Sequence, residues 1–509
     1  MTRARAAGWD LLCLAAGLAL PLAFAPWAAY PLAWLALIPL LLVASDPRPG
    51  RRFRRGLLFG LGLFGFGLHW LLPTIHTFGH MPLALAVPTW VLLVAYCALY
   101  PAVFALAAGW LGGALWVRLG LVLPLLWAGL EALRGWAFTG FPWLSLGASQ
   151  VPGPLGGWLP VVGSLGTGLA VAAVNGWLLL AGRALSRRNW GPAAGSVAVV
   201  AAVVGAGGVV GDVAWTRAEG APVAAALVQG NVPQTAKWDP ERRAAILARY
   251  ERLTRAHLGA DLVVWPETAV PLFADRATGY LNGLAADARA RGTTLLVGVP
   301  EREWVAGAKR YYNTVLALGE HQGRYRKRHL VPFGEYVPLR SILFFAEKFV
   351  PGDGTFVPGD SAEPLRLDGY RAGLSICYED AFPREVAATV RRGATVLVNV
   401  TNDAWFGRSI GPAQHAQLAR VRAREMGRPM LRVANTGLTF ATDHRGREIA
   451  AIPPDRPGVA RVEVRPRAGL TPYQLLAQGW LVGGLALALA GAVWAWWRGP
   501  VPRLRRPRR

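Results

Sequence analysis

Long apolar runs separated by short polar loops fill the first 213 residues of the chain, and one more apolar run lies near its C-terminal end. A helix needs roughly 20 apolar residues to cross the hydrocarbon core of a bilayer. Most of the runs reach about this length, although the second and fifth are short for it. The pattern therefore predicts eight membrane spans, at 9–27, 30–44, 57–75, 86–111, 120–136, 160–182, 192–212 and 474–497.

The stretch between these apolar parts follows a different pattern. Runs at 223–232 and 395–400 are short and rich in apolar residues, which predicts strands, whereas 240–258 and 412–426 predict helices. Alternation of this kind is typical of an α/β domain. The chain is thus predicted to have three parts: a membrane domain of seven helices over 1–213, an α/β domain over 214–472, and a final membrane helix with an Arg-rich tail over 473–509.

Composition and charge agree with a membrane protein. The chain is 53% hydrophobic, with a formal net charge of +24. Nucleic-acid binding would use clustered basic residues, but here the arginines gather in short loops such as 46–55 and 183–188 and in the tail, whereas loops 76–85 and 137–159 contain no Lys or Arg. This is the positive-inside pattern. We therefore expect cytoplasmic termini, an α/β domain on the outer face and no nucleic-acid partner.

Only three cysteines are present, and two of them, Cys13 and Cys97, lie in apolar runs. Cys377 is alone in the α/β domain, so it has no partner there for a disulfide in an oxidising compartment. It follows a strand-like run and precedes a helix-like one. A lone thiol at such a position is either an inert small hydrophobe or a nucleophile.

A cysteine nucleophile needs a group that accepts its proton. Glu267 follows the predicted strand 261–264, and strand ends of an α/β sheet converge at one edge. A carboxylate partly excluded from water can act as a base, although Glu267 could equally be a helix cap or a surface acid. A Cys–His pair also stays open, with five histidines in the α/β domain: His257, His321, His329, His415 and His444.

Lys327 stands out because the chain uses arginine for almost every cation. Only four lysines occur, and this one sits among Arg324, Arg326 and Arg328. A compact ammonium in that setting suggests a specific task, such as stabilising an oxyanion. The alternative is a solvated basic run.

Together these residues carry a family resemblance. Trp265-Pro-Glu267, Lys327 with the following Arg-His-Leu-Val-Pro-Phe-Gly-Glu335, and Cys377-Tyr-Glu379 resemble the Glu–Lys–Cys triad of the nitrilase superfamily. Asn402-Asp-Ala-Trp405-Phe-Gly and Phe141-Pro-Trp143 resemble blocks of its membrane-embedded branch, the apolipoprotein N-acyltransferases. The resemblance covers essentially the whole chain. It implies a polytopic helical membrane bundle joined to an α-β-β-α sandwich.

The resemblance also implies a reaction and three catalytic roles. Glu267 would be the base, Cys377 the nucleophile that becomes a thioester, and Lys327 the oxyanion stabiliser. An acyl chain would pass from a membrane phospholipid to the cysteine, and then to the N-terminal amine of a diacylglyceryl-cysteine apolipoprotein. We expect no cofactor, and no metal site, because no predicted helix carries a His-x-x-x-His pair and the sequence has no paired cysteines. We expect a monomer in the bacterial inner membrane with its catalytic domain in the periplasm.

Five supporting residues come from the same resemblance. Glu335 would hold the lysine or the substrate amine, while Tyr378 and Glu379 would shape the pocket beside the nucleophile. Trp238 and Trp405 would lie near the substrate entrance, with ordinary packing as the alternative for both.

The sequence also suits two other functions. One is a membrane-tethered amidase or nitrilase-type hydrolase, and the other is a catalytically inactive membrane scaffold.

Two further stretches carry predictions of their own. The 340–360 stretch, with several phenylalanines, predicts a long loop acting as a lid or interface anchor. Glu131 and Arg134, inside an apolar run, are best explained as an interfacial pair closing a helix end.

Overall fold

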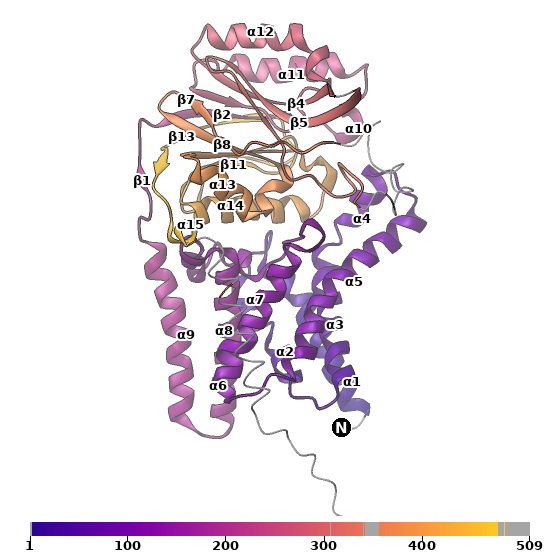
Figure 1. Ribbon diagram of the computed structural model, residues 1–509, viewed down its shortest axis with the longest axis vertical. Helices are drawn as coiled ribbons and strands as arrows, with labels where there is room; N and C mark the ends of the chain where they lie inside the picture. Colours follow the sequence, from indigo (N-terminus) through magenta and orange to yellow (C-terminus); the bar gives the residue numbers. More distant parts are fainter. Residues whose placement is uncertain (1–2, 306, 339–340, 342–355, 477–482, 484–509) are drawn as a thin grey trace, which may run out of the picture.

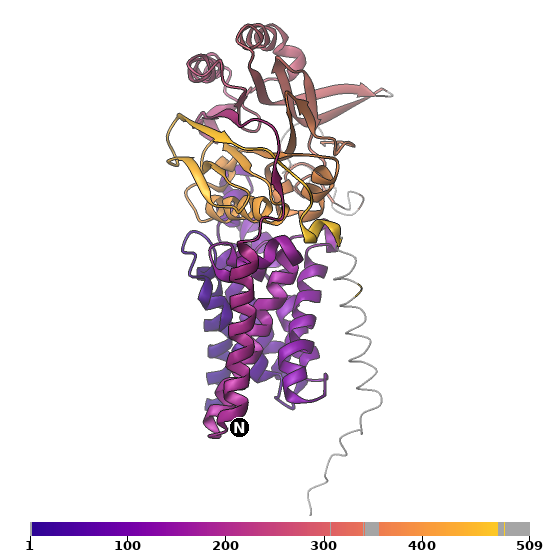
Figure 2. The same ribbon diagram turned by 90° about the vertical axis from the view of Figure 1, so that its left-hand side faces the viewer.

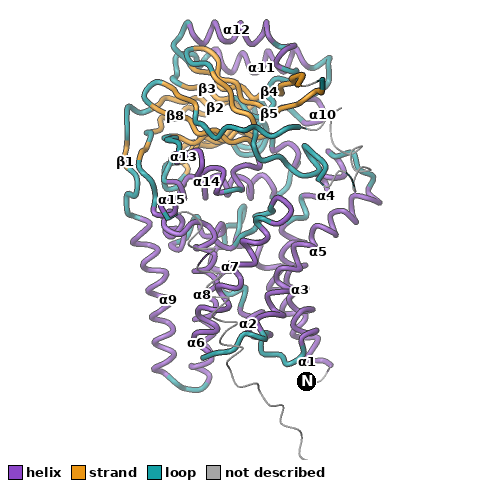
Figure 3. Tube along the Cα trace, in the orientation of Figure 1, coloured by secondary structure: helices purple, strands orange, loops and turns teal. Residues whose placement is uncertain are grey.

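The protein has a helical half and an α/β half stacked along its long axis (Figures 1 and 2). This computed structural model describes residues 3–305, 307–338, 341, 356–476 and 483. The chain passes from one half to the other between α9 (Trp190–Gly211) and the short strand β1 (Arg217–Ala218). Figure 3 shows that strands are confined to the middle of the upper half, between helices.

The helical half has the length and composition of a membrane bundle. Within the described residues, five helices are long and apolar enough to cross a bilayer: Ala6–Ala23, Leu83–Ala108 (α5), Leu115–Arg134 (with α7, Leu123–Arg134), Pro154–Ser186 (with α8, Leu159–Ser186) and α9. A bent pair adds a sixth if it is counted as one span. The predicted second span is a shorter apolar helix, Tyr30–Val43. The predicted eighth span lies almost entirely outside the described residues.

The predicted span 57–75 is broken rather than straight. Helix α3 (Pro49–Gly67) ends there, and the chain turns by 63° before Leu71–Phe78, which contains α4 (Leu71–Pro73). The Leu68 carbonyl accepts a hydrogen bond from Trp90 Nε1 at 3.0 Å, and the Gly67 carbonyl accepts one from Gln414 Nε2 at 3.2 Å. A helix can break at membrane depth when other groups satisfy the freed carbonyls. One of those groups belongs to the α/β half.

Two six-stranded sheets form the α/β half. One runs in the order β13 (Gly458–Val464), β2 (Val223–Gln229), β3 (Leu262–Val264), β4 (Thr294–Val305), β5 (Ala308–Gly319), β6 (Gly323–Arg326). The other runs in the order β12 (Glu448–Ile452), β11 (Thr439–Thr442), β10 (Met430–Ala434), β9 (Val396–Thr401), β8 (Tyr370–Ile376), β7 (Leu365–Leu367). The inner strands of both sheets are parallel, as expected for strands buried on both faces.

The two sheets pack face to face, with helices on both outer sides. Apolar side chains such as Leu227, Val264, Val398 and Leu431 fill the space between the sheets and are fully buried. Helices α11 (Arg243–Arg255) and α12 (Thr278–Arg289) cover the first sheet, and α13 (Pro383–Arg391) and α14 (Gly411–Met426) cover the second (Figure 1). The predicted α-β-β-α sandwich is confirmed, and α14 is the layer that meets the helical half.

Candidate active site

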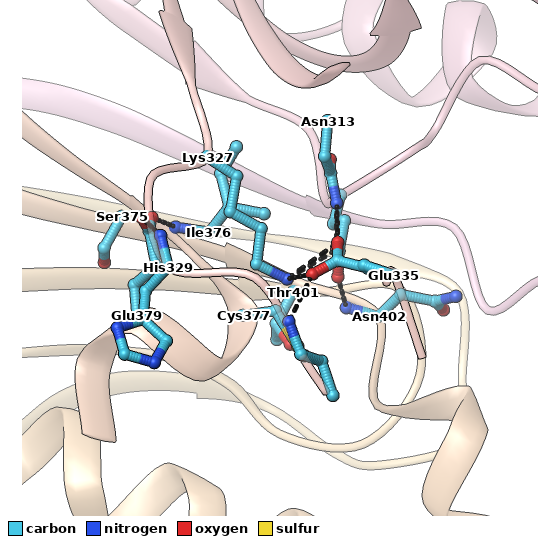
Figure 4. A network of polar contacts seen from close by, with 12 residues as sticks. Asn313, Lys327, His329, Glu335, Ser375, Ile376, Cys377, Glu379, Thr401 and Asn402 are labelled. Atoms are coloured by element: carbon cyan, nitrogen blue, oxygen red, sulfur yellow. Dashed lines mark hydrogen bonds and ion pairs between the residues drawn. The ribbon is translucent and has the colours of Figure 1, made fainter. Parts of the chain in front are cut away.

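The predicted triad comes together at the carboxyl ends of strands from both sheets. Cys377 directly follows β8, and Glu267 lies three residues after β3. Lys327 follows β6. Figure 4 shows the Lys327 side chain reaching toward Glu335 and the Cys377 segment, with Asn313 and Asn402 on the opposite side. The strand-end argument brought Glu267 and Cys377 to one edge, and the structure adds Lys327 from the end of β6.

The Glu267 carboxylate is buried and fixed at both oxygens. Its side chain accepts a hydrogen bond from Asn313 Nδ2 at 2.7 Å and another from the Asn402 backbone N–H at 2.8 Å. Lys237 donates from Nζ to the Glu267 carbonyl at 3.2 Å. The first two contacts hold the carboxylate in one orientation, which is what a general base requires, and the third holds the backbone of Glu267.

Lys327 is an ammonium group held between two carboxylates. Its Nζ lies 3.0 Å from Glu335 Oε1, 2.9 Å from Glu335 Oε2 and 4.0 Å from Glu267 Oε1. Burial opposes the positive charge, but the carboxylates of Glu335 and Glu267 outweigh it and raise the pKa of Lys327 above its usual value. The lysine therefore stays a cation beside the thiol.

The Cys377 thiol has the opposite electrostatic situation. Burial raises its pKa well above the usual value, the Glu267 charge raises it further, and Lys327 and a hydrogen bond with Thr401 oppose this. The thiol is thus protonated at neutral pH, so it needs a base to become a nucleophile. Its backbone is in the left-handed region, with φ of 52°. Such a conformation is costly for a residue other than glycine.

Glu335 serves the lysine, in agreement with the first of its two predicted roles. Besides its contacts with Lys327, it accepts hydrogen bonds from the Val331 backbone N–H at 2.8 Å and from Asn313 Nδ2 at 3.1 Å. The same amide group of Asn313 therefore contacts both Glu267 and Glu335.

The Glu379 carboxylate is completely buried and binds backbone instead of standing free in the pocket. It accepts hydrogen bonds from the Ile376, Arg328 and His329 backbone N–H groups at 2.6, 2.7 and 3.1 Å. Tyr325 Oη also donates to it. Glu379 thus ties the segment after Lys327 to the end of the strand that carries Cys377. The structure places it as a clamp between two site segments.

The three predicted aromatic residues lie around the site and not inside the triad. Tyr378 donates from its hydroxyl to the Gly140 carbonyl of the helical half at 3.1 Å. Trp405 makes an edge contact with Phe78, at 6.4 Å between ring centroids, so it also borders the helical half. Trp238 directly follows Lys237 and is 51% exposed. Two of the three therefore face the membrane part of the protein.

Several site residues were not expected from the sequence. Asn313 and the Asn402 backbone fix the Glu267 carboxylate. No local pattern marks Asn313, and Asn402 opens one of the family blocks quoted above without a role assigned to it. Lys237 carries a signal that went unused, because it is another of the four lysines in an arginine-rich chain. It is buried, and burial lowers its pKa to about 8 despite the nearby Glu267 charge.

His415 and the 340–360 loop were further candidates from the sequence. The Nε2 atom of His415 lies 3.1 Å from the Cys377 carbonyl oxygen, so this contact is with the backbone of the nucleophile. Most of the predicted 340–360 loop lies outside the described residues. Across the part of the chain that the structure describes, no group of three or more His, Cys, Asp and Glu side chains is arranged to hold a metal ion.

The predicted pair Glu131 and Arg134 organises a loop of the helical half. Arg134 donates to the Phe141 and Trp143 carbonyls, both at 2.6 Å, and Glu131 accepts from the Leu146 backbone N–H at 2.9 Å. Both side chains are buried. They therefore close the end of α7 through the 141–146 loop rather than through a direct ion pair with each other.

Comparison with known proteins matches both halves of the chain. Residues 16–177 match the family model described as the apolipoprotein N-acyltransferase N-terminal domain, and residues 224–473 match carbon-nitrogen hydrolase. The apolipoprotein N-acyltransferase of Methylococcus capsulatus is 43% identical over 493 residues, which cover 95% of each chain. That of Azotobacter vinelandii is 42% identical over 502 residues, covering 96% of this chain and 95% of the relative.

Among solved structures, an amidase from Nesterenkonia sp. is 20% identical to the chain. It aligns with a TM-score of 0.36, covering 53% of this chain and 97% of the amidase.

Proposed function

The chain belongs to the apolipoprotein N-acyltransferases, enzymes of lipoprotein maturation with a nitrilase-type catalytic domain, and we propose that it works through an acyl-thioester on Cys377. The observation that carries this proposal is the pairing of a protonated, partly buried thiol with a fixed carboxylate and an ammonium group. Those three groups are what thioester chemistry requires: nucleophile, base and oxyanion stabiliser.

In the first half-reaction, Glu267 accepts the thiol proton as Cys377 Sγ attacks the ester carbonyl carbon of a phospholipid. The new C–S bond gives a tetrahedral intermediate, whose oxyanion is stabilised by Lys327 and the Tyr378 backbone N–H. The C–O ester bond then breaks, and the proton on Glu267 passes to the leaving oxygen. The products are the Cys377 thioester and a lysophospholipid.

In the second half-reaction, the α-amine of the diacylated apolipoprotein attacks the thioester carbon. Glu267 takes a proton from the amine, the C–S bond breaks as the amide forms, and Glu267 passes that proton to the leaving sulfur, which regenerates the Cys377 thiol. The thioester must meet an amine before water, so a site closed to solvent favours transfer over hydrolysis. Burial of Glu267, Lys327 and Glu379 supports such a site.

The membrane setting supports a lipid donor. Tyr378 and Trp405 contact the helical half directly, so the site lies at the junction of the two halves. The N-terminus and the Arg-rich turn between α8 and α9 lie at the opposite end of the bundle (Figure 1). Under the positive-inside rule this supports cytoplasmic termini and a catalytic domain, about 214–472, in the periplasm of a bacterial inner-membrane protein. We take the working unit to be a monomer.

The test is acyl transfer by the purified protein in detergent. Phosphatidylethanolamine with a labelled acyl chain is the donor, and a synthetic diacylated lipopeptide with a free N-terminal amine is the acceptor. We expect labelled N-acyl peptide from the wild type and none from Cys377→Ala. Release of free fatty acid in place of acylated peptide would point to the hydrolase alternative, and equal product from Cys377→Ala would overturn the proposed nucleophile.

A further inference from the structure

A cluster of buried charges lies directly behind the nucleophile, and the mechanism above does not use it. His415 Nδ1 is 2.9 Å from Asp403 Oδ1, and its Nε2 is 3.1 Å from Asp380 Oδ1. Arg432 binds the second oxygen of each carboxylate, Asp380 at 3.1 Å and Asp403 at 2.9 Å. All four side chains are at most 1% exposed.

The net charge of the cluster is zero when His415 is protonated. Burial and Arg432 lower its pKa, but Asp380 and Asp403 outweigh them and raise it to about 9. Two cations then face two carboxylates. Buried charges are tolerated only when they are paired and hydrogen-bonded. Each cation of the cluster contacts both carboxylates, although Arg432 Nε has no partner among the described residues and Arg432 NH2 also lies 3.0 Å from His415 Nδ1.

Two contacts connect this network to the backbone of the nucleophile. His415 Nε2 lies 3.1 Å from the Cys377 carbonyl oxygen, and Asn399 Nδ2 lies 3.4 Å from the same atom. Asn399 also accepts from Arg432 NH1 at 2.8 Å, so both donors belong to one network. Backbone strain such as the left-handed φ of Cys377 persists only where the surroundings over-determine it. These two donors supply that constraint.

The residue before His415 connects the same turn of α14 to the helical half. Gln414 Oε1 accepts hydrogen bonds from Trp143 Nε1 at 2.7 Å and Trp70 Nε1 at 3.0 Å, and its amide donates to the Gly67 carbonyl. The Trp143 ring also contacts the His415 ring, at 5.7 Å between centroids. The position of His415 is therefore fixed from the membrane side.

We propose that His415 is a positioning residue for acyl transfer: its Nε2–H holds the Cys377 carbonyl and thereby keeps the nucleophile in its left-handed backbone conformation. Gln414 fixes the position of this turn of α14 relative to the broken helix α3. The inference rests on the proposed role of Cys377 as the acyl carrier. It assigns His415 no contact with substrate and no part in the proton transfers.

The test compares two charge-balanced double variants that differ only in a hydrogen-bond donor. His415→Gln with Asp380→Asn removes one charge of each sign and keeps an N–H near the Cys377 carbonyl. His415→Leu with Asp380→Asn has the same charge and similar volume but no donor. For each, the rate of acyl-adduct formation on Cys377 is measured against the concentration of phosphatidylethanolamine in mixed micelles, together with the melting midpoint.

We expect the Gln double variant to acylate close to the wild-type rate, and the Leu double variant to be about 10-fold slower in its maximal rate, as for loss of one hydrogen bond. KM should be the same in both. Equal maximal rates, or a loss confined to KM, would overturn the inference. The single variant His415→Gln is a second test if the double variants do not fold, because a loss as large as that of His415→Leu would also overturn it. No adduct on the wild-type protein would instead overturn the proposed function itself.

Discussion

At the scale of single residues, the site is built around a thiol that does not ionise by itself. Burial and the Glu267 charge raise the pKa of Cys377, while Lys327 opposes them only in part. The proposed mechanism therefore needs a fixed base, and Asn313 and the Asn402 backbone hold the Glu267 carboxylate beside the lysine.

Replacing Glu267 with Gln tests the base. The amide can still form hydrogen bonds in the same place but cannot accept the thiol proton, so we expect acylation of Cys377 to slow by about 10²–10⁴-fold. Donor binding should change little. Glu363→Gln is the matched control, because Glu363 is an exposed carboxylate paired with Arg392. If Glu267→Gln acylates as fast as this control, Glu267 is not the base.

Lys237 makes the free energy of unfolding vary with pH in the alkaline range. Burial depresses its pKa to about 8, with the Glu267 charge opposing, whereas an unfolded lysine titrates near 10.4. The unfolded chain then binds more protons between these values, so this residue makes stability rise as pH increases from about 8 to about 10. The melting midpoint of Lys237→Met should lack this pH dependence. Over that interval, the melting midpoint of the wild type should therefore rise relative to that of Lys237→Met. A constant difference between the two proteins would contradict the assigned shift.

At the scale of elements, α14 joins the two halves of the protein. Its Gln414 caps the carbonyl at the end of α3 and binds two indole groups of the helical half. Three residues later on the same helix, Gln417 accepts a single hydrogen bond from the Ala25 backbone N–H at 3.1 Å. Both glutamines lie at the interface between α14 and the helical half, but Gln414 binds two indole groups and a carbonyl there, whereas Gln417 binds one backbone N–H.

Exchanging each glutamine for leucine separates these roles. Gln414→Leu leaves two buried indole N–H groups and the Gly67 carbonyl without this partner, at a cost of about 1–3 kcal/mol for each unsatisfied group. We expect a clear fall in the melting midpoint and slower acylation of Cys377. Gln417→Leu should cause a smaller fall and acylate nearly as fast as the wild type. Equal acylation rates in both variants would show that Gln414 does not link the broken helix to the site.

The sequence predicted the elements that are buried and missed those that depend on partners elsewhere. Strands such as β2, β8 and β9 are continuous apolar runs and were expected. The strands β6, β7 and β12 have three to five residues and lie at or next to sheet edges, so they bury too little apolar surface to leave a pattern. The break after α3 was also missed, because hydropathy does not record a carbonyl bonded to Gln414.

The same limit applies to the site. Cys377, Glu267 and Lys327 were singled out because each is conspicuous locally, as a strand end or a rare residue type, and the family resemblance then joined them as a triad. The partners of Glu267 were not, since Asn313 and Asn402 reach it across 46 and 135 residues of sequence. His415 was considered only as a base for the thiol, and its contact with the Cys377 carbonyl depends on how α14 packs against the second sheet.

At the scale of the whole molecule, the architecture brings a nitrilase-type site to the surface of a membrane bundle. Trp405 and Tyr378 contact the helical half, so Cys377 lies close to the junction of the two halves. The Arg-rich loops lie at the far end of the bundle (Figures 1 and 2), and the positive-inside rule predicts that this end faces the cytoplasm.

Labelling of single introduced cysteines tests that orientation. In a background with Cys13, Cys97 and Cys377 replaced, Asp368→Cys reports on the α/β half and Arg48→Cys on an Arg-rich loop, both at exposed positions. In cells with a permeabilised outer membrane, a membrane-impermeant maleimide should label the first and reach the second only after lysis. The reverse pattern would place the catalytic half in the cytoplasm.

The central claim is that Cys377 carries the acyl chain between donor and acceptor, and the kinetics of that adduct test it most directly. The purified protein is first acylated with phosphatidylethanolamine in the absence of acceptor, and mass spectrometry of the Cys377 peptide measures the thioester. A diacylated lipopeptide is then added. If Cys377 is the acyl carrier, the thioester decays at least as fast as steady-state turnover, and one N-acylated peptide forms for each thioester lost. A thioester that decays more slowly than turnover, or product that forms without a thioester, would show that Cys377 is not the acyl carrier.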